Sequence, residues 1–244
     1  MNECKNYSFI VKRNKMKKIL IALLILVAIV TVVIVGLIGW TANTNQRLNV
    51  NQFTMTKLET KNMNVAEKIN SIDISVRTAA IQVRTGQKAN LQLTNVGQKQ
   101  CQIKQIDGQL SITENNFSKH QWEVGQSAKI ILTLPPKTLN HLQIEQLNGT
   151  LKLNDLTVKD LQLQHSNGTT IARKLTITGH GELDKHNGRT DLYQLTSDGL
   201  DVSVKSGQFK LNGIKKAGSG QRYRENGSHP LIIKSGSGQV RIAQ

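Results

Sequence analysis

The feature that most constrains the fold of this chain is an internal repeat in its C-terminal half. Turn glycines recur at intervals of 19, 20 and 19 residues, and apolar residues occupy most of the same offsets around them. These glycines are Gly149, Gly168, Gly188 and Gly207. A unit of this length holds two short strands with one apolar face, which so small a unit cannot bury alone. The repeat therefore predicts units that stack on one another.

Two further glycines extend the repeat. Gly238 has apolar residues at the same offsets and follows an insertion of twelve residues within 215–230. Gly108 fits upstream, with Cys101 in the apolar column seven residues before it. We therefore expect Cys101 to behave as a small buried hydrophobic residue.

The stacking mode follows from the residues around three Asn-Gly pairs. Such pairs favour hairpins, because a type I′ turn needs positive φ at both positions. In a hairpin the apolar residue seven before each glycine would face the residue six after it, which is polar or glycine in all four units. In a parallel solenoid equivalent residues stack about 4.8 Å apart, so Asn148, Asn167 and Asn187 would form an amide ladder. We expect an all-β fold, a parallel β-solenoid or β-helix-like repeat domain of about 19–20 residues per repeat; an antiparallel β-meander or sandwich is the alternative.

Strands are also expected upstream of the repeat. From Ile69 the sequence alternates between apolar and polar residues, and residues 114–128 interrupt this pattern. The expected strands are 72–76, 81–83, 91–93, 102–103, 110–112 and 130–134. Residues 41–68 show no sustained period and are interpreted as a linker.

An uncharged apolar run from Ile19 to Trp40 predicts one transmembrane helix. Its 22 residues would cover about 33 Å, which matches a hydrocarbon layer of roughly 30 Å. The run is longer than the apolar part of a signal peptide and lacks a small-x-small cleavage site, so we interpret it as an uncleaved anchor.

Basic residues before the helix set the expected orientation. Six lie in the fifteen residues before the span, whereas only Arg47 lies in the fifteen after it. The six are Lys5, Lys12, Arg13, Lys15, Lys17 and Lys18. We therefore expect a cytoplasmic basic tail (1–18), a transmembrane helix (19–40), a juxtamembrane linker (41–68) and an extracytoplasmic, extracellular β-repeat domain (69–244). Cys4 and Cys101 would lie on opposite sides of the membrane, which excludes an intrachain disulfide.

Together the anchor, the strand-rich region ending at Leu134-Pro135 and the units with Asn-Gly or Ser-Gly turns carry a resemblance. They are similar to a bacterial family of candidate adhesins, β-strand-repeat envelope proteins of unknown function that are membrane-anchored in Gram-positive bacteria. The resemblance covers residues 69–244. It implies a parallel β-repeat fold, a surface location and an adhesion or envelope-sensing role, and it brings no catalytic residues.

No arrangement of residues predicts catalysis, a cofactor or a metal site. The six histidines lack the close pairing with Cys or carboxylate that a zinc site needs, and His165 and His186 are interpreted as exposed turn residues. The glycine strings 216–221 and 234–239 lack the Gly-Lys-Ser/Thr ending of a phosphate loop. We therefore expect a protein that is not an enzyme. The predicted location argues against nucleic acid as a partner.

Positive charge indicates the kind of partner. Residues 41–244 carry 26 Lys+Arg against 15 Asp+Glu, spread along the chain. Only the insertion concentrates basic residues, and its candidate contacts to an anionic partner are Lys215, Lys216, Arg222 and Arg224. A solvated loop is the simpler reading of that segment. The hypothesis is a non-catalytic cell-surface binding or structural module that contacts anionic cell-wall polymer or lipid; the alternative is an envelope-stress sensor that acts through a membrane protein.

Overall fold

The computed structural model describes residues 2–119 and 121–244, without the side chains of residues 2–15 and 42. Cys4 and the basic residues as far as Lys15 therefore lie outside the described side chains. The chain forms two compact units. The first, here called the helical unit, holds the residues up to Met55 together with Trp122–Gln126. The second, the solenoid, holds Thr56–Gln121 and Ser127–Gln244.

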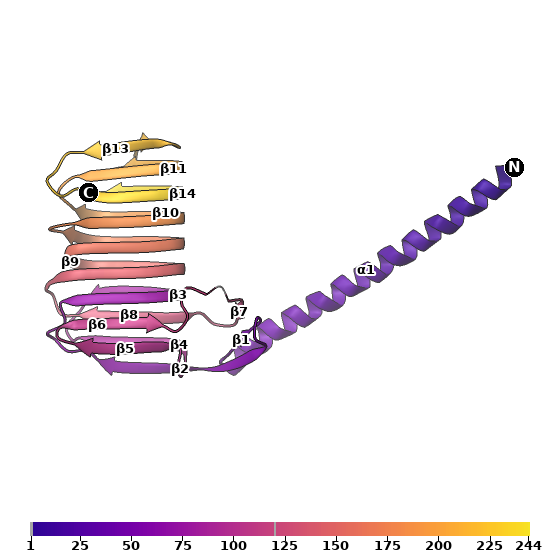
Figure 1. Cartoon of the computed structure of the whole chain (residues 1–244), viewed down its shortest axis with the longest axis horizontal. Coiled ribbons are helices and arrows are strands. Elements are labelled where there is room, and N and C mark those ends of the chain that lie inside the picture. Colours follow the sequence, from indigo (N-terminus) through magenta and orange to yellow (C-terminus); the bar gives the residue numbers. More distant parts are fainter. Residues whose placement is uncertain (1, 120) are drawn as a thin grey trace. The chain divides into compact units, whose positions relative to one another are not determined.

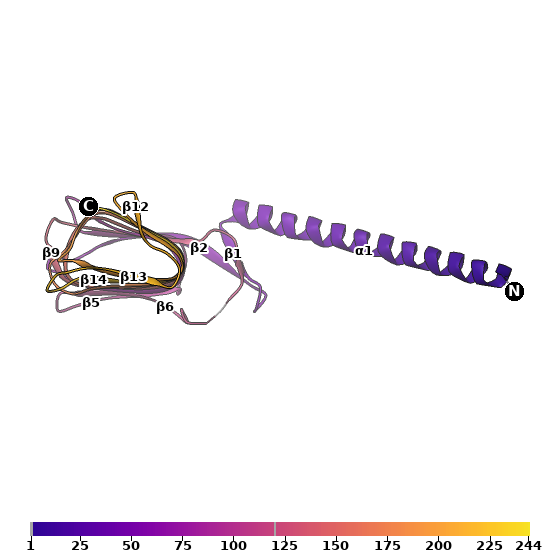
Figure 2. The same cartoon turned by 90° about the horizontal axis from the view of Figure 1, so that it is seen from above.

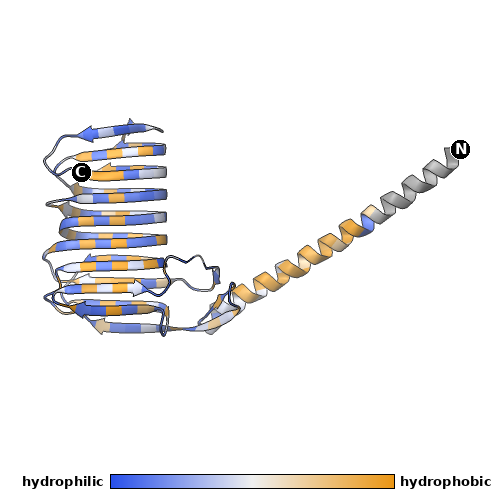
Figure 3. Ribbon diagram, in the orientation of Figure 1, coloured by the Kyte–Doolittle hydropathy of each residue, from blue (hydrophilic) through white to orange (hydrophobic). Residues whose placement is uncertain are grey.

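One long helix dominates the helical unit. Helix α1 (Asn2–Thr44) contains a segment, Met16–Thr41, with a mean hydropathy of 3.4 and no burial against protein (Figure 3). This segment is long and apolar enough to cross a membrane. Strand β1 (Gln46–Asn49) follows the helix and pairs antiparallel with β7 (Glu123–Val124).

The solenoid is a stack of parallel coils (Figure 1). Parallel registers join β3 to β9, β9 to β10, β10 to β14, and β14 to β11. Its strands are β2 (Thr54–Asn64), β3 (Ser71–Thr85), β4 (Asn90–Gly97), β5 (Cys101–Ile106), β6 (Gln109–Glu114), β8 (Ala128–Leu134), β9 (Thr138–Ile177), β10 (Gly181–Thr196), β11 (Leu200–Leu211), β12 (Ile214–Ala217), β13 (Gln221–Glu225) and β14 (Leu231–Ala243). Inward-facing Leu, Ile and Val side chains fill one continuous core. The parallel β-solenoid predicted from the repeat is thus confirmed.

The repeated glycines stack directly on one another at one corner of the coils. Gly188 is the register partner of Gly168 and of Gly238, and Gly207 is the partner of Gly238. These four glycines and Gly149 have φ between +113° and +135°. A Cβ atom on any of them would lie 1.8–2.0 Å from a carbonyl oxygen of the neighbouring coil. Only glycine satisfies both conditions, which explains the period seen in the sequence.

A second corner lies six residues after Gly149, Gly168 and Gly188, whereas the same position after Gly207 is Gly213, in the turn between β11 and β12. Asp155, Lys174 and Gln194 adopt φ of 55°, 51° and 54° at these three corners. Their side chains point outward, and Lys174 Nζ lies 3.3 Å from Asp155 Oδ1 of the next coil. The polar residues that argued against hairpins therefore occupy left-handed corners of the solenoid.

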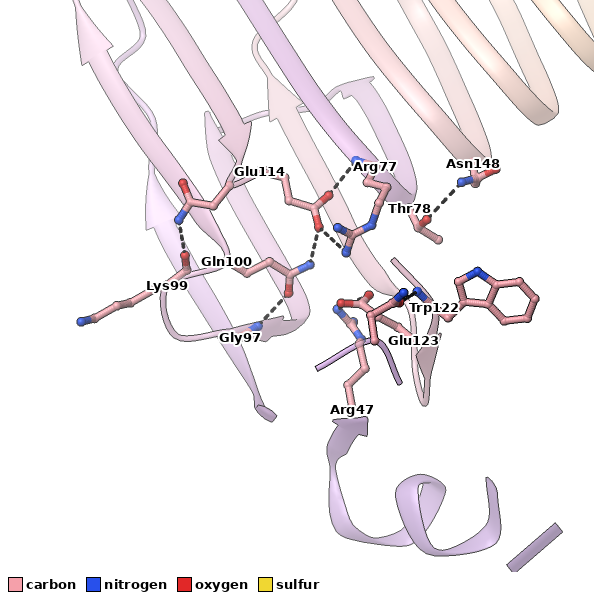
Figure 4. A network of polar contacts seen from close by, with 12 residues as sticks. Arg47, Arg77, Thr78, Gly97, Lys99, Gln100, Glu114, Trp122, Glu123 and Asn148 are labelled. Carbon is pink, nitrogen blue, oxygen red and sulfur yellow. Dashed lines mark hydrogen bonds and ion pairs between the residues drawn. The ribbon is translucent and has the colours of Figure 1, made fainter. Parts of the chain in front are cut away.

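The predicted amide ladder is present beside the glycine column. Asn187 Nδ2 donates to Asn167 Oδ1 at 3.0 Å, and Asn167 Nδ2 donates to Asn148 Oδ1 at 3.1 Å. The ladder continues to Thr78 Oγ1, which accepts from Asn148 Nδ2 at 3.4 Å (Figure 4). Nearby, Glu114 accepts a hydrogen bond from the Arg77 amide at 2.6 Å and forms a buried ion pair with its guanidinium.

The order of coils in space differs from their order in the chain. Strand β14 lies between β10 and β11, so β11 is the outermost coil. Strands β12 and β13 pair antiparallel with β11 and cover its edge. The insertion at 215–230 therefore contributes a cap to this end of the stack (Figures 1 and 2).

The opposite end of the stack is antiparallel, which corrects the expectation for Gly108. Strands β5 and β6 form a hairpin whose turn holds Asp107 and Gly108 at φ of 48° and 80°. Positive φ at both positions is the signature of a type I′ turn, so Gly108 is no coil corner. Cys101, at the start of β5, is half-buried instead of fully buried. Strand β2, within the segment interpreted as a linker, pairs with β4.

Candidate anion-binding cap

Positive charge is concentrated at the capped end of the solenoid. Residues 201–244 carry eight Lys+Arg against two Asp+Glu, whereas residues 69–200 carry fourteen against eleven. The first of these segments makes up most of β11, the cap strands and β14. More than half of the net positive charge of residues 41–244 is therefore carried by these coils and their cap.

Two of the four predicted contact residues are brought together by a carboxylate. Strand β13 places Arg222 and Arg224 beside Asp201 of β11. Arg222 forms a bidentate pair with Asp201, and Arg224 Nε donates to Asp201 Oδ2 at 3.1 Å. The hydrogen bonds from Arg222 are the main reason that the pKa of Asp201 lies below its usual value. Both arginine side chains stay more than half exposed, at 53% and 64%.

The other two predicted residues lie elsewhere on the cap. Lys215 and Lys216 belong to β12, which pairs with the part of β11 beyond the Gly207 corner. Figure 2 shows β12 and β13 on the two sides of the flattened coil. Both lysines are exposed, and neither has an ion pair among the described residues. The structure thus divides the predicted set into two pairs.

An open groove crosses the outer surface on the β13 side. Its exposed basic side chains are Lys205 of β11, Arg222 of β13 and Lys234 of β14; Asp184 and the buried Lys185, both of β10, also line it. Lys234 Nζ donates to Glu182 Oε1 at 2.6 Å, and this bond raises the pKa of Lys234. One signal in the sequence pointed to Lys205 and Lys234, because they lie two and four residues before repeat glycines, at outward-facing positions. Neither was predicted, since only the fold places them next to Arg222.

A column of polar residues points into the core, and sequence reasoning missed it. Gln146, His165, Lys185 and Ser235 each stand three residues before a repeat glycine and are buried. His165 was interpreted as an exposed turn residue, which is wrong; it is 1% exposed and its Nδ1 lies 2.8 Å from Thr170 Oγ1. Gln146 Nε2 donates to the carbonyl oxygens of Ala79 and Asn148 at 2.6 and 2.8 Å. In the described part of the chain Lys185 Nζ has no hydrogen-bond partner.

Burial dominates the titration of this column. It lowers the pKa of Lys185 to about 7. Burial, followed by the charge of Lys185, lowers the pKa of His165 to about 4. Because these side chains are buried, their titration affects the stability of the fold.

A solenoid with glycine corners, an antiparallel cap and one apolar N-terminal helix defines the structural class of this protein. The sequence profile of the Toastrack DUF4097 family matches residues 69–244. The chain therefore belongs to the Toastrack DUF4097 family. No curated protein matches it.

Solved structures match about three quarters of this chain. One is a candidate cell adhesion protein from Clostridium sporogenes, with a TM-score of 0.56, 15% identity, and coverage of 77% of this chain and 100% of the other. Another is a candidate adhesin from Bacteroides fragilis, with a TM-score of 0.31, 17% identity, and coverage of 76% and 97%. The first match supports the fold alone, because its sequence identity is low.

Proposed function

We propose that this protein is a membrane-anchored, non-catalytic binding module of the bacterial cell surface, and that its basic cap contacts anionic wall polymer. The single observation that carries the proposal is the excess of basic residues over acidic ones, eight against two, in residues 201–244. An exposed surface of one sign attracts polymers of the other sign. The adhesion role suggested for the Clostridium sporogenes protein of the same fold agrees with a binding module.

The arrangement of the coils supports this assignment. In the sheet order, β2 lies towards one end of the solenoid and β11 with its cap at the other. Strand β2 is the first solenoid strand after the apolar helix in the sequence, so the capped coil lies at the far end of the sheet order from it. A bacterial wall contains phosphate-rich polymers, and the exposed ammonium groups of Lys205, Lys215 and Lys216 provide point charges for phosphate.

The membrane topology can be tested with protease. We expect added protease to digest residues beyond Thr41 in intact, wall-stripped cells and to spare the basic tail. The reason is the six-to-one excess of basic residues on the N-terminal side of the helix. Epitope tags at the two termini provide the readout, and permeabilised cells serve as the control. A C-terminal tag that is protected until the cells are permeabilised would contradict the orientation.

Binding to anionic polymer can be tested on the full chain in neutral detergent micelles. We expect Lys205→Gln, Lys215→Gln and Lys216→Gln, combined, to weaken binding to purified teichoic acid about tenfold at low salt, because each exposed charge contributes about 0.5 kcal/mol. The wild-type affinity should also fall as salt shortens the Debye length from about 30 Å at 0.01 M to about 8 Å at 0.15 M.

The matched control removes the same charge from coils outside the cap. Lys129, Lys152 and Lys159 are also exposed lysines on strands. Their combined replacement by Gln should change affinity less than threefold. Equal losses of affinity in the two triple variants would show that binding depends on total charge and not on the cap. Absence of binding at low salt would favour the alternative, a sensor that acts through a membrane protein, which crosslinking in intact cells would identify.

A further inference from the structure

The helical unit exposes two large aromatic side chains that its own packing does not require. Phe53 is 85% exposed and Trp122 is 75% exposed. Phe53 also has φ of 50°, a left-handed conformation that is unfavourable for a bulky side chain. A residue that combines backbone strain with an exposed apolar ring weakens the isolated fold. Such a residue indicates a partner outside the chain.

Polar contacts around the buried Arg47 hold the segment that carries Trp122. The guanidinium of Arg47, which is 6% exposed, donates to the carbonyl oxygen of Gln126 at 2.6 and 3.0 Å. Arg47 also lies 3.7 Å from the carboxylate of Glu123. Figure 4 shows the Trp122 indole extending away from this pair.

The turn that carries Phe53 is fixed in the same way. Asn49 Oδ1 accepts hydrogen bonds from the amides of Asn51 and Gln52 at 3.0 and 3.2 Å. Asn51 Oδ1 accepts from the Trp122 amide at 2.6 Å, and the Val50 amide donates to the Trp122 carbonyl at 2.7 Å. The two aromatic residues therefore lie on one hydrogen-bonded scaffold.

The surroundings of this scaffold identify the partner by chemistry. It belongs to the same compact unit as the apolar segment that ends at Thr41, and β1 and β7 both contact α1. The charged residues in 42–55 and 122–126 are Arg47 and Glu123, which pair with each other. A neutral surface with exposed Trp and Phe suits the headgroup layer of a bilayer, where aromatic side chains concentrate at the ends of membrane helices.

We propose that Phe53 and Trp122 insert into the phospholipid headgroup layer of the membrane that α1 crosses. This inference rests on the proposed membrane anchoring. Because Trp122 lies in the segment between β6 and β8, its insertion gives the chain a second attachment to the bilayer, far in sequence from the helix. The binding is apolar and independent of lipid charge, since the scaffold carries no unpaired basic residue.

Tryptophan fluorescence tests the proposal, because the chain has two tryptophans, Trp40 and Trp122. The full chain is reconstituted into zwitterionic phosphatidylcholine vesicles that contain spin-labelled lipids. In the W40F variant we expect the Trp122 emission to be blue-shifted and to be quenched several-fold more by a headgroup label than by a label deep in the acyl chain. Adding anionic phosphatidylglycerol should leave this ratio unchanged.

Two companion variants separate the possible outcomes. In W122F, quenching of Trp40 reports whether the helix is in the membrane. Quenching of Trp40 without quenching of Trp122 would overturn the insertion and leave the anchor intact, whereas quenching of neither would overturn both proposals. In W40F with Phe53→Gly, we expect a higher thermal midpoint in micelles, since the strain at φ 50° is removed, together with weaker lipid quenching of Trp122. Unchanged quenching in that variant would remove Phe53 from the proposal.

Discussion

Replacing Gly188 by alanine is expected to destabilise the solenoid by about 3–5 kcal/mol, among the largest effects of a single substitution. The added Cβ atom would lie 2.0 Å from the carbonyl oxygen of Gly168. Since that oxygen belongs to the backbone of the adjoining coil, relief requires the two coils to separate. The φ of +113° adds a conformational cost of its own.

Urea unfolding of the full chain in neutral micelles, followed by circular dichroism, measures this loss. Gly213→Ala is the matched control, because Gly213 also has positive φ, +81°, but no atom lies within 4 Å of its added Cβ. It should cost only about 1 kcal/mol, the conformational part alone. Similar midpoints for the two variants would show that the contact between coils is not the reason for glycine at this corner.

Replacing Lys185 by methionine is expected to stabilise the solenoid, most strongly below neutral pH. Lys185 is fully buried, and in the described part of the chain its ammonium has no hydrogen-bond partner. Burial lowers its pKa from 10.5 to about 7. The unfolded chain therefore binds more protons than the folded chain between these values, and stability rises with pH across this window. This lowering of the pKa corresponds to a free energy on the order of 5 kcal/mol, which is an upper limit for the stability that Lys185→Met gains at pH 6.

Unfolding of wild type and Lys185→Met at pH 6 and pH 10 tests this expectation, and the gain should shrink at pH 10. Lys174→Met is the control, because Lys174 is exposed beside Asp155 and should give no gain. His165 adds a separate dependence at lower pH. Its pKa of about 4, against 6.5 when unfolded, means that stability is lost as pH falls from 6.5 towards 4. A wild-type stability that does not change between pH 6 and pH 10 would contradict a buried charge at Lys185.

The solenoid could be predicted because its corners restrict residue choice. A corner that tolerates only glycine, and a second that favours polar residues, recur together in the coils of Gly149, Gly168 and Gly188, whereas β3 has Ala79 in the glycine column. Strand β2 escaped prediction because it is mostly exposed, with Leu58 its buried residue, so it shows no apolar alternation. The prediction for His165 was wrong because residue type alone does not show whether a polar side chain points into the core or towards solvent.

The candidate site could be predicted only in part, for a related reason. The insertion pointed to Arg222 and Arg224, and the structure places both beside Asp201. The insertion did not point to Lys205 and Lys234, because these residues become neighbours of Arg222 only through the pairing of β11 with β14 and β13. Nor could the position of β14 be deduced, since each coil presents the same apolar columns to its neighbours.

The position of β14 also sets the order in which this solenoid is completed. Strand β11 and its cap have no other parallel neighbour, so until residues 231–243 are in place they cannot join the stack. During synthesis the edge of β10 therefore stays unpaired after β11 has been made, and it pairs only when β14 follows. Docking closes a loop across the whole cap, a non-local step of the kind that slows folding. The coil that is synthesised later thus fixes the earlier one in the stack.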